Sequence, residues 1–187
     1  LLDQDGRFHQ LSRYNESEAV VVYVQGLNDA VSAQGYSVLQ DLQTRYAGQG
    51  VVFFMLNAAR DSTRQAVQAE LTQHGLDIPV LLDTAQLVAR SLGVKTTAEA
   101  FILDPSSHGI VYRGPLDSRV AVDDADPQLP IPYLESALKA VLANVDSEEE
   151  PELPAVSGTP VDYEYVTRFG DRQISYQDEI VPIVQKR

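Results

Sequence analysis

Short apolar runs alternate with amphipathic stretches from Leu1 to Asn144, and this alternation leaves few folds open to the chain. Ala19–Val24 (AVVVYV) and Val51–Leu56 (VVFFML) are continuous apolar runs, typical of strands that are buried on both faces. Pro79–Asp83 (PVLLD) indicates a third, shorter strand. Apolar residues recur at helical spacing between these runs. The pattern predicts an α/β fold in which helices connect the strands.

Three helices are expected among these strands, and capping residues or glycines mark their ends. A first helix is predicted over Val31–Tyr46, with glycines after it. Ser62 and Gln65 form a capping box for a second helix. Thr84 is expected to cap a third.

Two further apolar runs, Ala100–Asp104 and Gly109–Gly114, predict a β-hairpin. Pro132–Asn144 then carries apolar residues on one face and predicts a closing helix. A turn pair at Asp5–Gly6 predicts another short hairpin before the core begins. Alternating strands and helices followed by a hairpin predict a mixed central β-sheet with helices on both faces.

The composition changes after Asn144. Residues 145–160 combine acidic residues with prolines and predict an acidic linker. Residues 161–187 have a mixed composition again and predict an extended C-terminal arm, with the pattern of the start of a following module. The arm carries four aromatic residues that are candidates for an interface, because it has little core of its own. They are Tyr163, Tyr165, Phe169 and Tyr176.

Charge and cysteine content exclude several classes of function. A net charge of -13 opposes binding to the phosphates of nucleic acids and to anionic membrane surfaces. No apolar run approaches the ~20 residues of a membrane-spanning helix, so no membrane insertion is expected. The chain has no cysteine, which removes disulfides, thiolate metal sites and thiol catalysis. Its three histidines share no metal-ligand spacing, so no metal site is expected.

Several motifs resemble a known family. The element order, the turn after VVVYV and the stretches DGRFHQLS, GVVFFMLN, IPVLLDTAQLVARSLGV and EAFILDP resemble the thioredoxin-like fold. The similarity is to its redoxin or peroxiredoxin-like branch, of the alkyl hydroperoxide reductase and thiol-specific antioxidant type. VYRGPLDSR and ISYQDEIVPIVQKR resemble a bacterial subfamily fused to c-type cytochrome and copper monooxygenase-like regions. This resemblance implies haem c or copper in a following module, no cofactor in the present residues, and a periplasmic or extracellular location.

The chain departs from this family at three places that carry thiol chemistry. Where the family has a cysteine followed by proline, this sequence has Asp29–Ala30. Thr97–Ala98 stands where the fold usually places a cis-proline, and Gly158–Thr159 replaces a glycine–cysteine pair after the linker. The resemblance therefore implies a degenerate site without a catalytic residue, at Asp29, Ala30, Thr97 and Ala98.

A carboxylate at position 29 would stand where the first long helix begins, and there it can accept hydrogen bonds from free backbone amides. It forms neither a mixed disulfide nor a sulfenic acid. We therefore expect Asp29 to cap the helix and not to react. Without a cis-proline, the Thr97–Ala98 bond is expected to be trans, and the edge that receives an extended substrate is expected to be lost.

Three hypotheses on function remain open. The first is a non-catalytic thioredoxin-like pseudoenzyme, a scaffold or docking domain for a protein partner or adjacent domain in a larger exported electron-transfer or oxidative protein. The second is a redoxin-type oxidoreductase or antioxidant protein whose haem c, copper or cysteines lie outside these residues. The third is a structural subunit of a multi-chain assembly.

Overall fold

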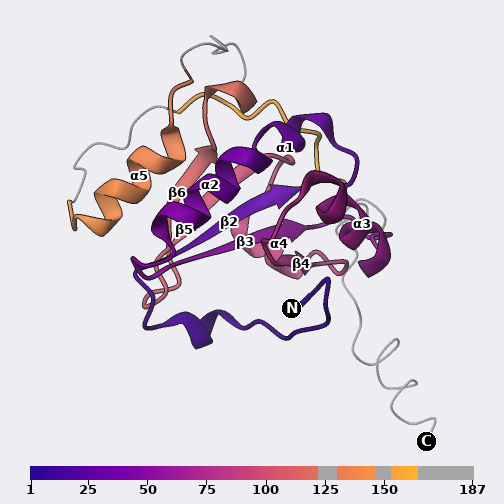
Figure 1. Ribbon diagram of the computed structural model, residues 1–187, viewed down its shortest axis with the longest axis horizontal. Helices are drawn as coiled ribbons and strands as arrows, with labels where there is room; N and C mark the ends of the chain where they lie inside the picture. Colours follow the sequence, from indigo (N-terminus) through magenta and orange to yellow (C-terminus); the bar gives the residue numbers. More distant parts are fainter. Residues whose placement is uncertain (122–129, 146–152, 164–187) are drawn as a thin grey trace, which may run out of the picture.

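The predicted α/β class is confirmed by the computed structural model, which describes residues 1–121, 130–145 and 153–163 (Figure 1). The described residues form a six-stranded mixed sheet in the order β1-β4-β3-β2-β5-β6. The strands are β1 (Leu2–Asp3), β2 (Ala19–Gln25), β3 (Val51–Asn57), β4 (Val80–Leu82), β5 (Glu99–Leu103) and β6 (Ile110–Pro115).

Helices cover both faces of this sheet, as predicted. The helices are α1 (Ala30–Gln34), α2 (Tyr36–Tyr46), α3 (Arg64–His74), α4 (Leu87–Leu92) and α5 (Tyr133–Leu142), and 3-10 turns are found at Leu11–Tyr14 and Ser118–Val120. One core contains side chains of α2, α3 and α5. The second core, on the other face, contains side chains of α4.

The burial of strand β2 on both faces explains why residues 19–24 are apolar without interruption. The strand pairs in parallel with β3 and antiparallel with β5, and all seven of its residues are buried. Its odd-numbered residues from Ala19 to Tyr23 enter the first core, and its even-numbered residues from Val20 to Val24 enter the second. A strand that is covered on both faces has no polar side, because successive side chains point in opposite directions.

The predicted N-terminal hairpin is also confirmed. Leu2 forms an antiparallel bridge with Phe8, and Gly6 takes the left-handed conformation in the turn with φ 82°. Leu2 and Asp3 then add to the sheet as β1, antiparallel to β4. The predicted hairpin of β5 and β6 forms as well, with antiparallel pairing.

The single helix predicted over Val31–Tyr46 is wrong in one respect, because the structure divides it at Gly35 into α1 and α2. The Gly35 amide donates to the Ser32 carbonyl at 3.1 Å. The buried hydroxyl of Tyr23 donates to the same carbonyl at 2.8 Å. A Cβ atom at position 35 would lie 2.5 Å from the Tyr23 hydroxyl, so the tyrosine occupies the space that a side chain would need.

The capping box predicted at Ser62 does not form. Thr63 is the cap of α3, and its hydroxyl accepts from the Ala66 amide at 3.2 Å. The Ser62 hydroxyl donates instead to Asn57 Oδ1 at 2.6 Å. The Ser62 hydroxyl therefore bonds to the buried side chain of Asn57 and does not cap α3.

Thr84 is likewise not the cap of α4. The neighbouring Asp83 is buried, and its two carboxylate oxygens accept from the amides of Leu87 (3.0 Å) and Ala89 (2.7 Å). A carboxylate has two oxygens and can accept hydrogen bonds from two backbone amides at once, whereas a threonine hydroxyl has only one oxygen. Gly93 ends the helix, and it takes the left-handed conformation with φ 65°.

We expect Gly35→Ala to lower the free energy of unfolding by about 1–3 kcal/mol, because the added methyl group overpacks the space beside Tyr23. Gly48→Ala is the matched control, since an added Cβ there meets no atom within 4 Å. Its effect should stay within about 0.5 kcal/mol. Urea denaturation followed by circular dichroism measures both. Equal stability of the two variants would contradict this account of the helix break.

Candidate functional site

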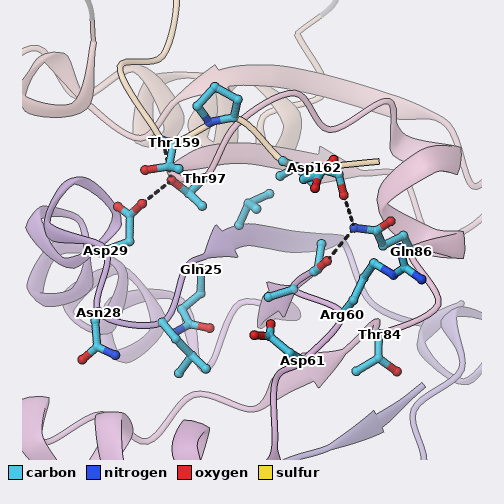
Figure 2. Close-up of a pocket in the computed structure, with 17 residues that line it drawn as sticks. Gln25, Asn28, Asp29, Arg60, Asp61, Thr84, Gln86, Thr97, Thr159 and Asp162 are labelled. Carbon is cyan, nitrogen blue, oxygen red and sulfur yellow. Dashed lines mark hydrogen bonds between the residues drawn. The ribbon is translucent and has the colours of Figure 1, made fainter. Parts of the chain in front are cut away.

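Three residues from distant parts of the chain meet at the carboxyl end of β2 (Figure 2). Asp29 lies in the loop between β2 and α1, and Thr97 lies just before β5. Thr159 belongs to residues 157–161, a segment that we call the strap. These residues lie at the three places where the sequence departs from the family that it resembles.

The Asp29 carboxylate accepts hydrogen bonds from three directions. Asp29 Oδ1 accepts from the Ser32 amide at 2.7 Å, which confirms the prediction that Asp29 caps the first helix. Asp29 Oδ2 accepts from the Thr97 hydroxyl at 2.9 Å. The side chain of Thr159 also hydrogen-bonds to this carboxylate. The Thr97 hydroxyl accepts in turn from the Thr159 amide at 2.9 Å, which ties the strap to the site.

These hydrogen bonds determine the charge of Asp29. Burial by itself would raise the pKa of Asp29, but the bonds from Thr159, Ser32 and Thr97 outweigh it and lower the pKa below 3.8. Asp29 is therefore a carboxylate at neutral pH. Its oxygens serve as acceptors for a backbone amide and for hydroxyl groups of the protein itself.

The strap pairs with the main chain just before β5. The Thr97 amide donates to the Thr159 carbonyl at 2.8 Å, and the Val161 amide donates to the Lys95 carbonyl at 2.9 Å. Together they frame an antiparallel bridge of Thr96 with Pro160. The loss of an edge that receives an extended substrate stays a prediction, because the chain's own strap covers this edge in the structure.

The other two residues of the predicted degenerate site, Ala30 and Ala98, lie at the start of α1 and just before β5. Ala30 begins α1, and it is exposed. Ala98 is fully buried, takes the left-handed conformation with φ 62°, and donates its amide to the Val24 carbonyl at 2.8 Å. The Thr97–Ala98 bond is trans, as expected. This strained turn fixes the Thr97 side chain over the end of β2.

Gly158 shows why a glycine precedes Thr159. A Cβ atom there would lie 1.8 Å from the Thr97 carbonyl oxygen, which is far inside the contact distance of the two atoms. Only a residue without a side chain lets the strap approach this closely. The sequence predicted a linker at this position. The glycine itself was the one local sign that the chain approaches another segment closely here.

An open cleft of about 950 Å³ lies beside the strap, between the loop after β2 and the loop after β3 (Figure 2). Its polar lining includes Gln25, Asn28, Arg60, Asp61, Gln86 and Asp162. The Gln86 amide closes one end, since its Nε2 donates to the carbonyls of Ala58 (3.0 Å) and Asp162 (2.7 Å). Sequence reasoning missed Gln86, because nothing in its local pattern marks a contact with residue 162.

A buried polar network supports the loop that carries Asp29. The Tyr36 hydroxyl donates to Glu70 Oε1 at 2.8 Å, and the backbone amide of Asn28 donates to Glu70 Oε2 at 2.9 Å. Burial raises the pKa of the Tyr36 hydroxyl, which therefore keeps its proton and remains a donor. Asn57 donates to Gln25 Oε1 at 2.6 Å across the paired ends of β2 and β3. The sequence offered one sign of this network, namely polar residues that directly follow apolar runs.

Of the four aromatic interface candidates, the structure describes only Tyr163. Its hydroxyl donates to the Val94 carbonyl at 2.8 Å, and the Arg90 guanidinium lies 5.4 Å from the centre of its ring. Tyr163 therefore packs on its own domain. Tyr165, Phe169 and Tyr176 lie outside the described residues, as do residues 146–152 of the predicted linker. The boundaries 1–144, 145–160 and 161–187 stay predictions, but residues 153–163 lie against the domain.

No candidate metal site emerges from the part of the chain that the structure describes. Within residues 1–121, 130–145 and 153–163, His, Asp and Glu side chains form no group of three or more that could hold an ion. No helix in these ranges has the length and apolar character to cross a membrane. Haem c or copper in a following module stays a prediction.

Asp29→Ala should lower the free energy of unfolding by about 1–2 kcal/mol near pH 7, because α1 loses its cap and two hydroxyls lose their acceptor. The pKa of Asp29 in the folded state lies below its ordinary 3.8. The stabilisation is therefore fully present above pH 3.8 and is lost as the pH falls through the folded-state pKa. Denaturation of wild type and variant at pH values from about 7 to about 2 tests this.

Asp29→Asn is the control, because it keeps an acceptor oxygen without the charge. It should cost less than Asp29→Ala near pH 7. If the penalty of Asp29→Ala did not shrink in acid, the charge of Asp29 would not matter to the fold.

Comparisons with known proteins agree with this architecture. No curated protein is significantly similar to the chain. Among solved structures, a hypothetical protein of Sinorhizobium meliloti is 24% identical, with a TM-score of 0.73 over 86% of this chain and 88% of that one. Peroxidoxin BcpB of Mycobacterium tuberculosis is 17% identical, with a TM-score of 0.57 over 79% and 92%.

A thiol:disulfide interchange protein of the thioredoxin family from Chlorobium tepidum is 16% identical, with a TM-score of 0.57 over 76% of this chain and 91% of that one. These similarities show that the fold is thioredoxin-like. The sequence profile of the redoxin family matches residues 1–129. A cysteine-free chain with this sheet, this site and this match over most of its length belongs to the redoxin family.

Proposed function

We propose that this redoxin domain is non-catalytic and acts as a docking module. The observation that carries the proposal is the state of Asp29, at the position where the family resemblance places the cysteine. Its carboxylate accepts from Ser32, Thr97 and Thr159, and the whole chain contains no cysteine. A carboxylate in this position binds donors but cannot exchange disulfides or reduce peroxide.

In this proposal the domain serves as a scaffold that holds a following segment in a fixed place. The strap and Tyr163 are joined to the domain by main-chain and side-chain hydrogen bonds, so the described chain is held at a defined point as far as Tyr163. The neighbour is an adjacent domain of the same chain or a protein partner. The resemblance of VYRGPLDSR and ISYQDEIVPIVQKR supports an exported electron-transfer or oxidative protein, and with it a periplasmic or extracellular location.

The purified protein should neither reduce insulin disulfides nor consume hydrogen peroxide above the rate in buffer. Asp29→Asn should behave identically, because no reaction passes through this residue. A redoxin with its cysteines intact serves as the positive control in both assays. Activity of the wild type that falls in Asp29→Asn would refute a non-catalytic role.

A second candidate is a redoxin-type oxidoreductase whose redox centre lies outside residues 1–187. The observation that favours it is the resemblance of ISYQDEIVPIVQKR to a segment that precedes haem attachment in the subfamily. Purification of the natural protein from its source, followed by visible absorption and intact mass, separates the candidates. Covalent haem or bound copper would make the redoxin domain an accessory to that centre. A natural protein without haem, copper or cysteines would refute this second candidate.

A further inference from the structure

We propose that Tyr14 is a redox-active residue, which gives one electron to an outer-sphere oxidant while His9 takes the proton of its hydroxyl group. Asp3 holds His9 in place as the third member of a hydrogen-bonded chain. We call Asp3, His9 and Tyr14 the N-terminal relay. This inference goes beyond the docking role, because it concerns residues outside the site of Asp29 and a reaction that needs no thiol.

The N-terminal relay is a continuous chain of two short hydrogen bonds. The Tyr14 hydroxyl lies 2.7 Å from His9 Nδ1, and His9 Nε2 lies 2.8 Å from Asp3 Oδ2. Asp3 and His9 belong to the N-terminal hairpin, whereas Tyr14 ends the 3-10 turn that follows it. The imidazole therefore bridges a tyrosine hydroxyl and a carboxylate, so each of its two nitrogens has a partner.

Asp3 determines which nitrogen of the imidazole carries hydrogen. Asp3 Oδ1 accepts from the amides of Asp5 (2.9 Å) and Arg7 (2.8 Å). Burial by itself would raise the pKa of Asp3, but the hydrogen bonds from His9, Arg7 and Asp5 lower it below 3.8. A carboxylate only accepts, so Nε2 of His9 donates to it. In the neutral imidazole this leaves Nδ1 as an acceptor for the Tyr14 hydroxyl.

This arrangement matches what the one-electron oxidation of a phenol requires. Loss of an electron makes the phenol hydroxyl strongly acidic, so the electron leaves readily where a base takes the proton. Burial raises the pKa of the Tyr14 hydroxyl, which therefore holds its proton until it is oxidised. A base within hydrogen-bond distance of that proton meets the geometric condition for proton transfer.

The proposed step balances in atoms and electrons. The O–H bond of Tyr14 breaks, an N–H bond forms at His9 Nδ1, and one electron passes to the oxidant. The products are a neutral tyrosyl radical, a histidinium ion and the oxidant reduced by one electron. The histidinium lies beside the Asp3 carboxylate, and a hydrogen bond between two charged groups is stronger than one between neutral groups. Return of one electron to Tyr14 and of the proton from His9 restores the starting state.

The surroundings of the N-terminal relay shield the base and leave the tyrosine within reach. The side chains of Asp3 and His9 are only 1% and 15% exposed, whereas Tyr14 is half-buried. The rings of His9 and Tyr14 pack edge-on to Phe54, with centroid distances of 5.1 and 5.3 Å. The proton can therefore pass to His9 away from bulk water, while the electron leaves through the surface to an oxidant outside the protein.

Other tyrosines of the described chain have partners that are less suited to take a proton. The hydroxyls of Tyr23, Tyr112 and Tyr163 donate to main-chain carbonyls, which do not act as bases. Tyr36 donates to a carboxylate, a weaker base than an imidazole. The chain has neither cysteine nor tryptophan, and its one methionine is buried. Tyrosines are therefore the side chains most open to one-electron oxidation, and the imidazole favours Tyr14 among these five.

The test mixes the full chain with hexachloroiridate(IV), a one-electron oxidant, in a stopped-flow instrument. Loss of the oxidant's colour gives the rate, and electron paramagnetic resonance of rapidly frozen samples detects the tyrosyl radical. Tyr14→Phe keeps the ring beside Phe54 and should lose the fastest phase and the early radical signal. Tyr163→Phe is the matched control and should react as the wild type, because Tyr163 is also half-buried but donates to a carbonyl. Equal early rates and signals of wild type and Tyr14→Phe would overturn the proposal.

Two further measurements test the role of His9. His9→Asn offers an amide that can accept a hydrogen bond but takes up no proton, so the fastest phase should slow by about ten-fold or more. The wild type should also react more slowly in D2O than in H2O, because a proton moves with the electron. This comparison needs no variant and so covers the case in which His9→Asn fails to fold.

An unchanged rate in D2O would overturn the proposal, as would an unchanged rate of a His9→Asn variant that keeps the circular dichroism of the wild type. The non-catalytic docking role would survive either result, since it depends on the disulfide and peroxide assays alone. Conversely, disulfide or peroxide activity that depends on Asp29 would leave the N-terminal relay unaffected, because the two sites share no residue.

Discussion

Strand β2 is buried along its whole length, and the site depends on the directions of the strands beside it. Because β2 and β3 run parallel, the loops that follow them arrive at the same end of the sheet. Strand β5 runs antiparallel to β2, so it begins where β2 ends and brings Thr97 to that end as well. The Ala98 amide fixes this meeting by donating to the Val24 carbonyl. The order and direction of the strands therefore bring the loops that line the cleft to one end of the sheet.

At this end of β2, Asp29 acts as a hydrogen-bond acceptor. The carboxylate caps a short helix and also links two threonines that approach from other segments. A thiol would contribute little to such a set, because sulfur is a weak acceptor. The family resemblance implies a sulfur atom at this position, so a carboxylate changes what the end of β2 can hold, while the fold is thioredoxin-like. The proposed docking role takes its support from this change and from the strap, which already occupies the edge.

Much of the fold could be predicted because hydrophobic periodicity acts within short segments. The strands around Ala19–Val24 and Val51–Leu56 and the hairpin of β5 and β6 all formed as expected. The errors arose where a distant side chain decided a local outcome. The helix divides at Gly35, where the hydroxyl of Tyr23 fills the space beside the glycine, and Ser62 bonds to Asn57 and does not cap α3. No window of sequence around either residue contains that information.

The sequence by itself determined the class of fold and the absence of thiol chemistry, since the first depends on local patterns and the second on residue type. It also determined that Asp29 would cap a helix, because a cap and its helix are neighbours in the chain. Only the tertiary structure decided that Asp29 meets Thr97 across 68 residues, and that Thr97 meets Thr159 across 62. Contacts of this kind depend on where strands pair and on how closely Gly158 can approach a carbonyl, and these are properties of the folded backbone.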